Sequence, residues 1–178
     1  MMDWSNLRAK KITMTEYKRT KAGSFLYSFT MSAGGFLCRH PILAQILNAT
    51  WGIIGVLIGA IMMLVVIILP KKKKSGSFNG FPYVMFGDNW GGLEGVIWFF
   101  IADNMGEDWT RHTMQHETGH AFQNAIFGPF TILLIGIPSM IRYWVRVVRK
   151  SEIPYDAIWF EGSATDLGME YDALRNKR

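Results

Sequence analysis

Residues 116–120 read His-Glu-Thr-Gly-His, within a stretch from Thr110 to Phe127 whose composition favours an α-helix. His116 and His120 are about one helical turn apart, so their imidazoles share a face and can hold one metal ion. Glu117 follows the first histidine and can act as a general base on a water molecule bound to that ion. Zn²⁺ suits this chemistry because it lowers the pKa of such a water to about 7. The motif therefore predicts a zinc site.

A catalytic zinc ion takes a third protein ligand and keeps a fourth position open. His112 lies one more turn back, but three histidines on one straight helix form a strip rather than a ring. We therefore expect the third ligand from a second helix that follows Pro154. Glu161 is the best of four acidic candidates, because the small residues 162–164 let that helix approach closely. The other three candidates are Asp156, Asp166 and Glu170, and Asp166 stays open as a direct ligand.

Two residues after Glu161 can support the site without binding the metal. Thr165 or Asp166 could hydrogen-bond to a ligating histidine from behind and fix its orientation. Four side chains are candidates to stabilise the negative charge that develops on a substrate oxygen, and the sequence does not rank them. They are Tyr143, Tyr155, Tyr171 and His112.

Two histidines followed by a later helical glutamate resemble the gluzincin pattern of zinc metallopeptidases. Longer stretches resemble a group of small bacterial membrane proteins with metallopeptidase-like motifs, namely residues 86–95, 116–124, 128–129, 137–139 and 159–165. The resemblance implies Zn²⁺ with His116, His120 and Glu161 as ligands and Glu117 as base. It also implies a zincin-like α+β domain whose strand near residues 92–101 borders the cleft.

One position departs from the gluzincin pattern. Thermolysin-like members carry an acidic residue four positions after the glutamate, where this chain has Thr165 and Asp166 comes one position later. The stretch 116–121 also resembles the site-2 type of intramembrane protease, which takes an aspartate from a distant membrane helix. The chain is short for that core, so this second resemblance is the weaker one.

The composition sets outer limits on the fold and the class of protein. The chain has 178 residues, a formal net charge of +5 and 49% hydrophobic residues. That apolar fraction excludes a disordered chain. The single cysteine, Cys38, excludes a disulfide framework and a zinc site built from cysteines.

A long uncharged run predicts a membrane span. Residues 42–69 carry no charge, and the four lysines 71–74 follow directly. A run of this length crosses a hydrocarbon core of ~30 Å as a helix, and lysines at its end suit a cytoplasmic interface with anionic lipids. We therefore expect a transmembrane helix over 42–70, after a basic and partly interfacial segment over 1–41. A basic linker over 71–79 would then lead to the zincin-like domain over 80–178.

A second uncharged run, residues 121–141, is also long enough to span. If this run spanned the bilayer, the chain after Arg142 would have to recross the hydrocarbon for Glu161 to reach the metal. It would do so as irregular backbone with charged side chains, which lipid does not tolerate. If Glu161 is a ligand, this run is instead a re-entrant or surface-lying hairpin. Breaks are expected at Gly128-Pro129 and Gly136–Pro138, with the basic limb 142–150 at the lipid headgroups.

The expected fold is thus a mainly α membrane protein with one transmembrane helix, the apolar hairpin and a small zincin-like α+β domain. Residues 96–101 should form a strand, with a hairpin to residues 83–86 as a further option. The expected function is a zinc metallopeptidase in a bacterial cell membrane, with its catalytic domain on the cytoplasmic side and a peptide or protein as substrate. The alternative is a non-catalytic membrane subunit or scaffold that retains the metal-binding fold. Because aromatic and apolar residues interleave the basic run 142–150, we expect a lipid bilayer as partner and no nucleic acid.

Overall fold

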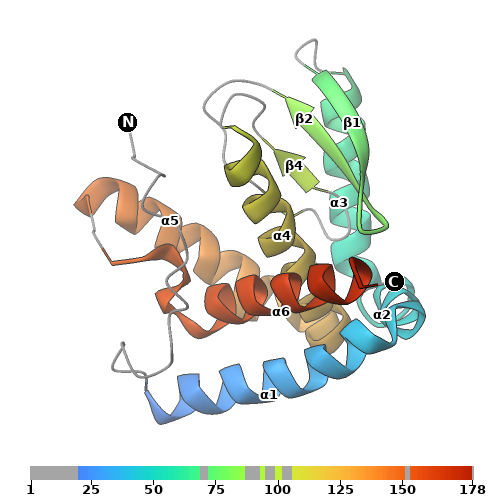
Figure 1. Cartoon of the computed structure of the whole chain (residues 1–178). Helices are drawn as coiled ribbons and strands as arrows, with labels where there is room; N and C mark the ends of the chain where they lie inside the picture. The colour runs from blue at the N-terminus through green and yellow to red at the C-terminus, as the bar shows by residue number, and fades with distance from the viewer. Residues whose placement is uncertain are drawn as a thin grey trace.

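The computed structural model describes residues 20–68, 72–86, 93–94, 99–101, 106–150 and 153–177. These residues form a mainly helical protein with one small sheet (Figure 1). The helices are α1 (Lys21–Arg39), α2 (Pro41–Ala49), α3 (Ile53–Ile68), α4 (Glu107–Phe127), α5 (Ile137–Arg149) and α6 (Trp159–Arg175). The strands are β1 (Lys72–Phe78), β2 (Phe81–Phe86), β3 (Leu93–Glu94) and β4 (Phe99–Ile101). Residues 1–19 of the predicted basic segment lie outside the described part, and α1 packs on α6.

The centre of the fold is the close crossing of α4 and α6. A methyl group added to Gly119 would collide with the backbone carbonyl of Ala164, and one added to Gly168 would collide with that of Gln115. Each helix thus offers a glycine to the backbone of the other. This reciprocal contact lets the two helices approach more closely than larger side chains would allow.

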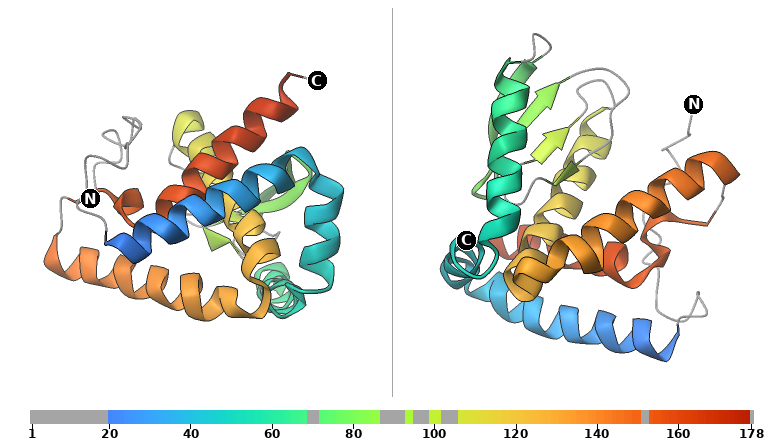
Figure 2. Two further views of the ribbon diagram at one scale, coloured as in Figure 1. Left: turned by 90° about the horizontal axis from the view of Figure 1, so that it is seen from below. Right: turned by 180° about the vertical axis from the view of Figure 1, so that it is seen from behind.

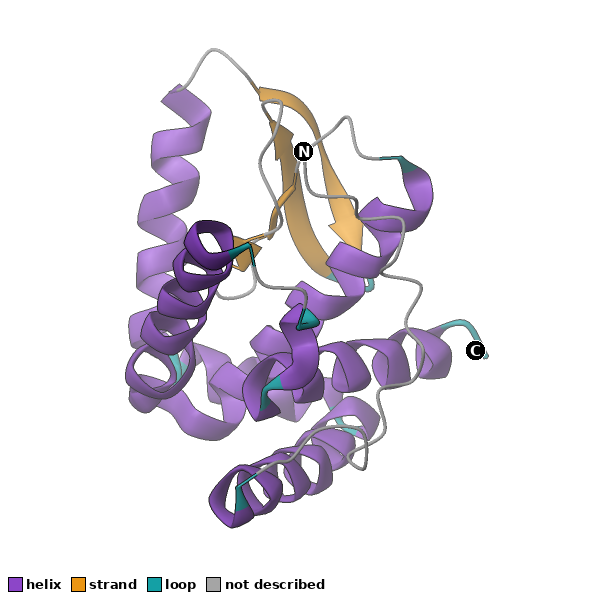
Figure 3. Cartoon of the chain, turned by 90° about the vertical axis from the view of Figure 1, so that its left-hand side faces the viewer, coloured by secondary structure: helices purple, strands orange, loops and turns teal. Residues whose placement is uncertain are grey.

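The sheet lies between α3 and α4, at one end of the molecule (Figures 1 and 3). Its order is β1-β2-β4-β3, and the side chains alternate between its faces. Val84 and Phe100 pack against Val66 of α3, whereas Phe81 and Ile101 belong to the core around α4. The edge strand β3 packs against α4 as well.

Two expectations about the strands need correction. The segment expected as a linker forms β1, which pairs antiparallel with β2 through a turn at Asn79-Gly80, where both φ angles are positive. The strand expected over 96–101 is β4, of which residues 99–101 are described. It does lie beside residues 83–86, but the two strands run parallel, so they do not form a hairpin.

The expected transmembrane helix over 42–70 is broken. Helices α2 and α3 meet at an angle of 82°, and no single helix among the described residues is long and apolar enough to cross a membrane. Polar contacts hold the bend. Asn124 of α4 donates hydrogen bonds to the Asn48 side chain (2.8 Å) and to the Gly52 carbonyl (3.2 Å), while Asn48 donates to the Ala121 carbonyl (3.1 Å). The expectation of one unbroken helix fails because it rested on the absence of charges, whereas Asn124, which holds the bend, is far away in the sequence.

A second sharp bend follows α4. The helical stretches Glu107–Phe130 and Ile132–Arg149 meet at 114°, and Gly128 takes a φ of 55° at the expected break. No break occurs at Gly136–Pro138, where a π-helical turn (Ile132–Gly136) runs directly into α5. The Trp51 and Phe130 rings lie 6.3 Å apart, so α3 and the chain leading to α5 start from the same corner and diverge (Figure 2).

Candidate metal centre

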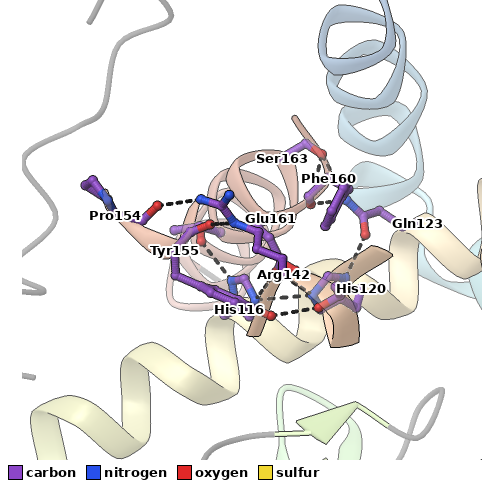
Figure 4. Close-up of polar contacts among 11 residues, drawn as sticks. His116, His120, Gln123, Arg142, Pro154, Tyr155, Phe160, Glu161 and Ser163 are labelled. Carbon is purple, nitrogen blue, oxygen red and sulfur yellow. Dashed lines mark hydrogen bonds and ion pairs between the residues drawn. The ribbon is translucent and has the colours of Figure 1, made fainter. Parts of the chain in front are cut away.

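Three side chains from α4 and α6 converge where these two helices meet (Figure 4). His116 and His120 come from α4 and Glu161 from the first turn of α6. Glu161 Oε2 lies 3.1 Å from His116 Nε2 and 3.3 Å from His120 Nε2, and the two nitrogens are 3.2 Å apart. The structure thus brings together the two histidines of the motif and the expected glutamate as a group able to hold a metal ion.

The size of this triangle fits one face of a tetrahedral zinc site. Zinc binds histidine nitrogen and carboxylate oxygen at about 2.0–2.2 Å, which places neighbouring ligands of a tetrahedron about 3.3–3.5 Å apart. The three observed edges, 3.1, 3.2 and 3.3 Å, are close to that spacing. A single proton can bridge only one edge, whereas a cation at the centre attracts all three atoms. The donor set therefore fits Zn²⁺.

Gln123, one turn further along α4, determines which ring nitrogen of His120 carries the hydrogen. The Gln123 amide nitrogen donates to the Phe160 carbonyl (2.6 Å) and to Ser163 Oγ (2.9 Å), which fixes the orientation of the amide. Its oxygen then faces His120 Nδ1 at 2.7 Å, so Nδ1 carries the hydrogen and donates. In neutral His120 the Nε2 lone pair consequently points into the triangle, as a metal ligand requires.

His116 has a different partner behind it. Its Nδ1 lies 2.8 Å from Thr165 Oγ1 on α6, so Thr165 is in the supporting position considered from the sequence. Asp166 instead accepts a hydrogen bond from Tyr27 of α1 and is outside the metal-binding group found among the described residues. Glu170 forms an ion pair with Arg39 at 3.5 Å. Of the four acidic candidates, Glu161 is the one placed at the histidines.

The site is buried, and its electrostatics favour a negative Glu161. Burial acts to raise the pKa of this carboxyl, but the neighbouring imidazoles of His116 and His120 outweigh it and hold the pKa well below its usual range. Glu161 Oε1 is fully buried and has no hydrogen-bond partner among the described residues, which leaves it available to a cation. Glu117, the expected base, is also buried on α4, where it follows His116 directly in the sequence.

Tyr155, in the short helical turn Tyr155–Ala157, is placed at the centre. Its ring lies 6.2 Å from that of His116, and its hydroxyl is 2.7 Å from Ser139 Oγ. Burial, and next the negative charge of Glu161, raise the pKa of the phenol, so it stays protonated at neutral pH and can donate a hydrogen bond.

The other three candidates for that role are placed differently. Tyr171 is in the core against Phe81 and Phe122, and its hydroxyl donates to the Asn79 carbonyl. Tyr143 is exposed on α5. His112 is one turn before His116, and burial followed by the charge of His116 lowers its pKa.

Gln123 and Arg142 are parts of the site that sequence reasoning missed. Gln123 follows the motif by three positions, but its partners on α6 come about forty residues later, as Phe160 and Ser163. Arg142 Nε donates to the Tyr155 carbonyl at 2.8 Å and thereby fixes the turn that carries Tyr155. A local spacing signal existed for Gln123, at one turn from His120. No such signal marks Arg142. The sequence predicts it at the lipid headgroups with the rest of the basic run 142–150, whereas the structure places it at the Tyr155 turn.

Comparison of the chain with protein-family models, with curated proteins and with solved structures gives no match.

Proposed function

We propose that this chain is a membrane-associated zinc metallopeptidase. The observation that carries the proposal is the triangle of lone-pair donors His116, His120 and Glu161, whose size suits a tetrahedral ion. The buried Glu117 follows His116 directly on the same helix. Zinc in such a site supplies a Lewis acid and a water of lowered pKa, which is the chemistry of amide hydrolysis at neutral pH.

The protein's own residues have distinct roles in this proposal. Glu117 accepts the proton of the attacking water and passes it to the leaving amine. Tyr155 donates a hydrogen bond to the substrate carbonyl oxygen as negative charge develops on it. Gln123 and Thr165 hold the two histidines so that their Nε2 atoms face the metal.

Exposed apolar surface supports an association with a bilayer. Both α2 and α3 expose large aliphatic side chains, although α3 packs its other side on the sheet. Six of them are Ile42, Ile46, Leu57, Ile61, Leu64 and Ile68. The lysines 71–74 follow α3 and suit the anionic lipids of a cytoplasmic membrane surface. In this proposal the protein sits on the cytoplasmic face of a bacterial membrane.

The alternative function is a non-catalytic membrane subunit with a structural metal. Two observations speak against it. Structural zinc sites use four protein ligands, whereas the group found among the described residues supplies three. A structural site also has no use for a general base, yet Glu117 is buried next to the ligands.

The test is a pair of variants with two separate measurements, zinc content and cleavage of a peptide library with and without chelator. Glu117→Gln should keep about one zinc ion per chain and lose turnover by roughly 10²–10⁴-fold, because an amide cannot accept the proton. Glu161→Ala should lose zinc, because a ligand is gone. Zinc loss in Glu117→Gln with zinc retained in Glu161→Ala would reverse the two assignments. Zinc without any chelator-sensitive cleavage in the native protein would favour the subunit.

A further inference from the structure

Helix α5 is amphipathic, but its polarity is the reverse of that of an ordinary surface helix. Ser139, Arg142 and Arg146 lie on one face, at helical spacing, and this face is turned toward the protein. The opposite face is apolar and exposed, from Met140 through Trp144 (59% exposed) to Val148 (78% exposed). Every residue of α5 is at least partly accessible. A helix in water would turn these faces the other way.

The polar face of α5 contacts one short segment, the one that carries Tyr155. Ser139 Oγ meets the Tyr155 hydroxyl at 2.7 Å. Arg142 donates to the carbonyls of Tyr155 (2.8 Å) and Pro154 (2.7 Å). The guanidinium groups of Arg142 and Arg146 both lie 5.9 Å from the centre of the Tyr155 ring. Figure 4 shows Arg142 of α5 beside Tyr155 and the two histidines. Only α5 and the Tyr155 segment therefore separate the outer face of α5 from the metal centre.

We propose that the outer face of α5 is embedded in the hydrocarbon of a lipid bilayer, and that the substrates of the metal centre are polypeptide segments at that membrane surface. The contact of α5 with lipid does not depend on the proposed peptidase function. The substrate class rests on that function.

Three features identify lipid as the occupant. The apolar face continues through the exposed Phe130 and Leu133 toward Trp51, so it forms a strip longer than α5 itself. From residue 132 to residue 148 this strip extends about 25 Å. It ends in the exposed cations Arg149 and Lys150, which complement anionic headgroups, and the exposed Tyr143 and Trp144 lie between one and two helical turns before them.

The substrate class follows from where α5 holds the site. An apolar helix face enters the boundary of a bilayer by about 5–10 Å. Because Arg142 fixes the Tyr155 turn to the inner face of the same helix, the metal centre is held close to the lipid headgroups. Segments of other proteins that emerge from the bilayer are then presented at the site, whereas freely diffusing peptides gain nothing from the arrangement.

A depth measurement tests the lipid contact without any use of activity. An environment-sensitive fluorophore is attached to Val148→Cys, in a Cys38→Ala background, in the full chain reconstituted into phosphatidylcholine–phosphatidylglycerol vesicles. The matched control is Ala173→Cys, an exposed position on α6. The probe at 148 should shift to shorter wavelength and be quenched by spin-labelled lipid, and the probe at 173 should do neither. Equal behaviour at the two positions would overturn the proposal. So would energy transfer between labelled chains without lipid quenching, since a second copy would then cover α5.

A pair of peptides tests the substrate class. Both carry one cleavable sequence, but only one has a transmembrane anchor that places this sequence at the vesicle surface. We expect at least a tenfold higher kcat/KM for the anchored peptide, and a smaller ratio in Val148→Glu than in the control Ala173→Glu. Equal kcat/KM values would overturn the substrate class. If neither peptide were cut, the proposed peptidase and its substrate class would both fail, while the quenching result would still decide the contact with lipid.

Discussion

At the scale of single residues, the metal centre depends on the atoms behind the ligands as much as on the ligands. Gln123 accepts a hydrogen bond from His120 Nδ1, and its amide group is fixed in turn by the Phe160 carbonyl and Ser163. This chain of contacts selects the tautomer whose Nε2 lone pair faces His116 and Glu161, where a metal ion would bind. It also ties the supporting residue to α6, the helix that carries Glu161.

We expect Gln123→Leu to weaken zinc affinity by roughly 10–100-fold, because His120 then lacks the acceptor that orients it. Competition for zinc with a chromophoric chelator measures the change. The matched control is Gln115→Leu on the same helix, since Gln115 hydrogen-bonds Asp172 rather than a ligand. That variant should lose some stability and keep its zinc affinity. Equal zinc affinities in the two variants would show that Gln123 does not orient the ligand.

The convergence of His116, His120 and Glu161 was predictable because the information is local and chemically specific. His116 and His120 are one turn apart on a single helix, and Glu161 follows from the need for a third ligand and from the small residues after it. The roles of Gln123 and Arg142 were not predictable in the same way. Each acts through backbone carbonyls of a distant or irregular segment, Phe160 for one and the turn at Tyr155 for the other. No residue-type pattern marks such a partner.

At the scale of elements, the distance between α4 and α6 sets the size of the metal triangle. Gly119 lies inside the motif, and Gly168 lies two turns beyond Glu161. Both let one helix rest on the backbone of the other. The middle of the motif therefore has a structural function as well as a chemical one, because the glutamate reaches the histidines only across this short gap.

Gly119→Ala should lower the free energy of unfolding by about 1–3 kcal/mol or more, because its methyl group forces the helices apart. It should also lower zinc affinity, since Glu161 moves away with α6. The control is Gly136→Ala, a helical position with open space around the added methyl group, where we expect unchanged or slightly higher stability. Thermal unfolding and zinc titration give the two readouts. Native zinc affinity in a folded Gly119→Ala variant would contradict the role of the close approach.

Helices with local signals were predicted well, and pairings over long distances were not. The motif helix was expected over 110–127 and spans 107–127. The bend at Asn48 depends on Asn124, which is 76 positions away, so the uncharged run gave no local sign of it. The parallel pairing of β2 with β4 also lacks a local signal, because a crossover rather than a tight turn connects parallel strands.

At the scale of the whole molecule, one buried carboxylate joins the sheet to the two central helices. Asp172 of α6 accepts hydrogen bonds from Asn79 in the β1–β2 turn (2.8 Å) and from Arg111 (2.6 Å) and Gln115 (2.7 Å) of α4. Burial acts to raise the pKa of this carboxyl, but the three donors outweigh it and lower the pKa. The ionised form is thus favoured by folding.

The sign of the pH dependence follows from that shift. The folded pKa of Asp172 lies below its unfolded value, so its contribution to stability is complete above the unfolded pKa and is lost as the pH falls through the folded pKa. Asp172→Asn should cost about 1–3 kcal/mol at neutral pH, because the donors around it, Asn79, Arg111 and Gln115 among them, lose a charged acceptor. This difference from the native protein should shrink on acidification. Denaturant unfolding at a series of pH values measures it, and a difference independent of pH would exclude a charged Asp172 as the connection.

The contact between Asn48 and Asn124 also has a consequence for the synthesis of the protein. During synthesis, the uncharged run 42–69 is complete 55 residues before Asn124 is added. In that interval it is an unbroken hydrophobic signal of the length that a translocon recognises. We expect nascent chains that end before residue 124 to crosslink to the translocon through this run, and the crosslink to be lost in full-length chains but retained with Asn124→Leu. We thus expect the same residues to act twice, first as a translocon signal in the nascent chain and later, once α4 is complete, as the bend between α2 and α3.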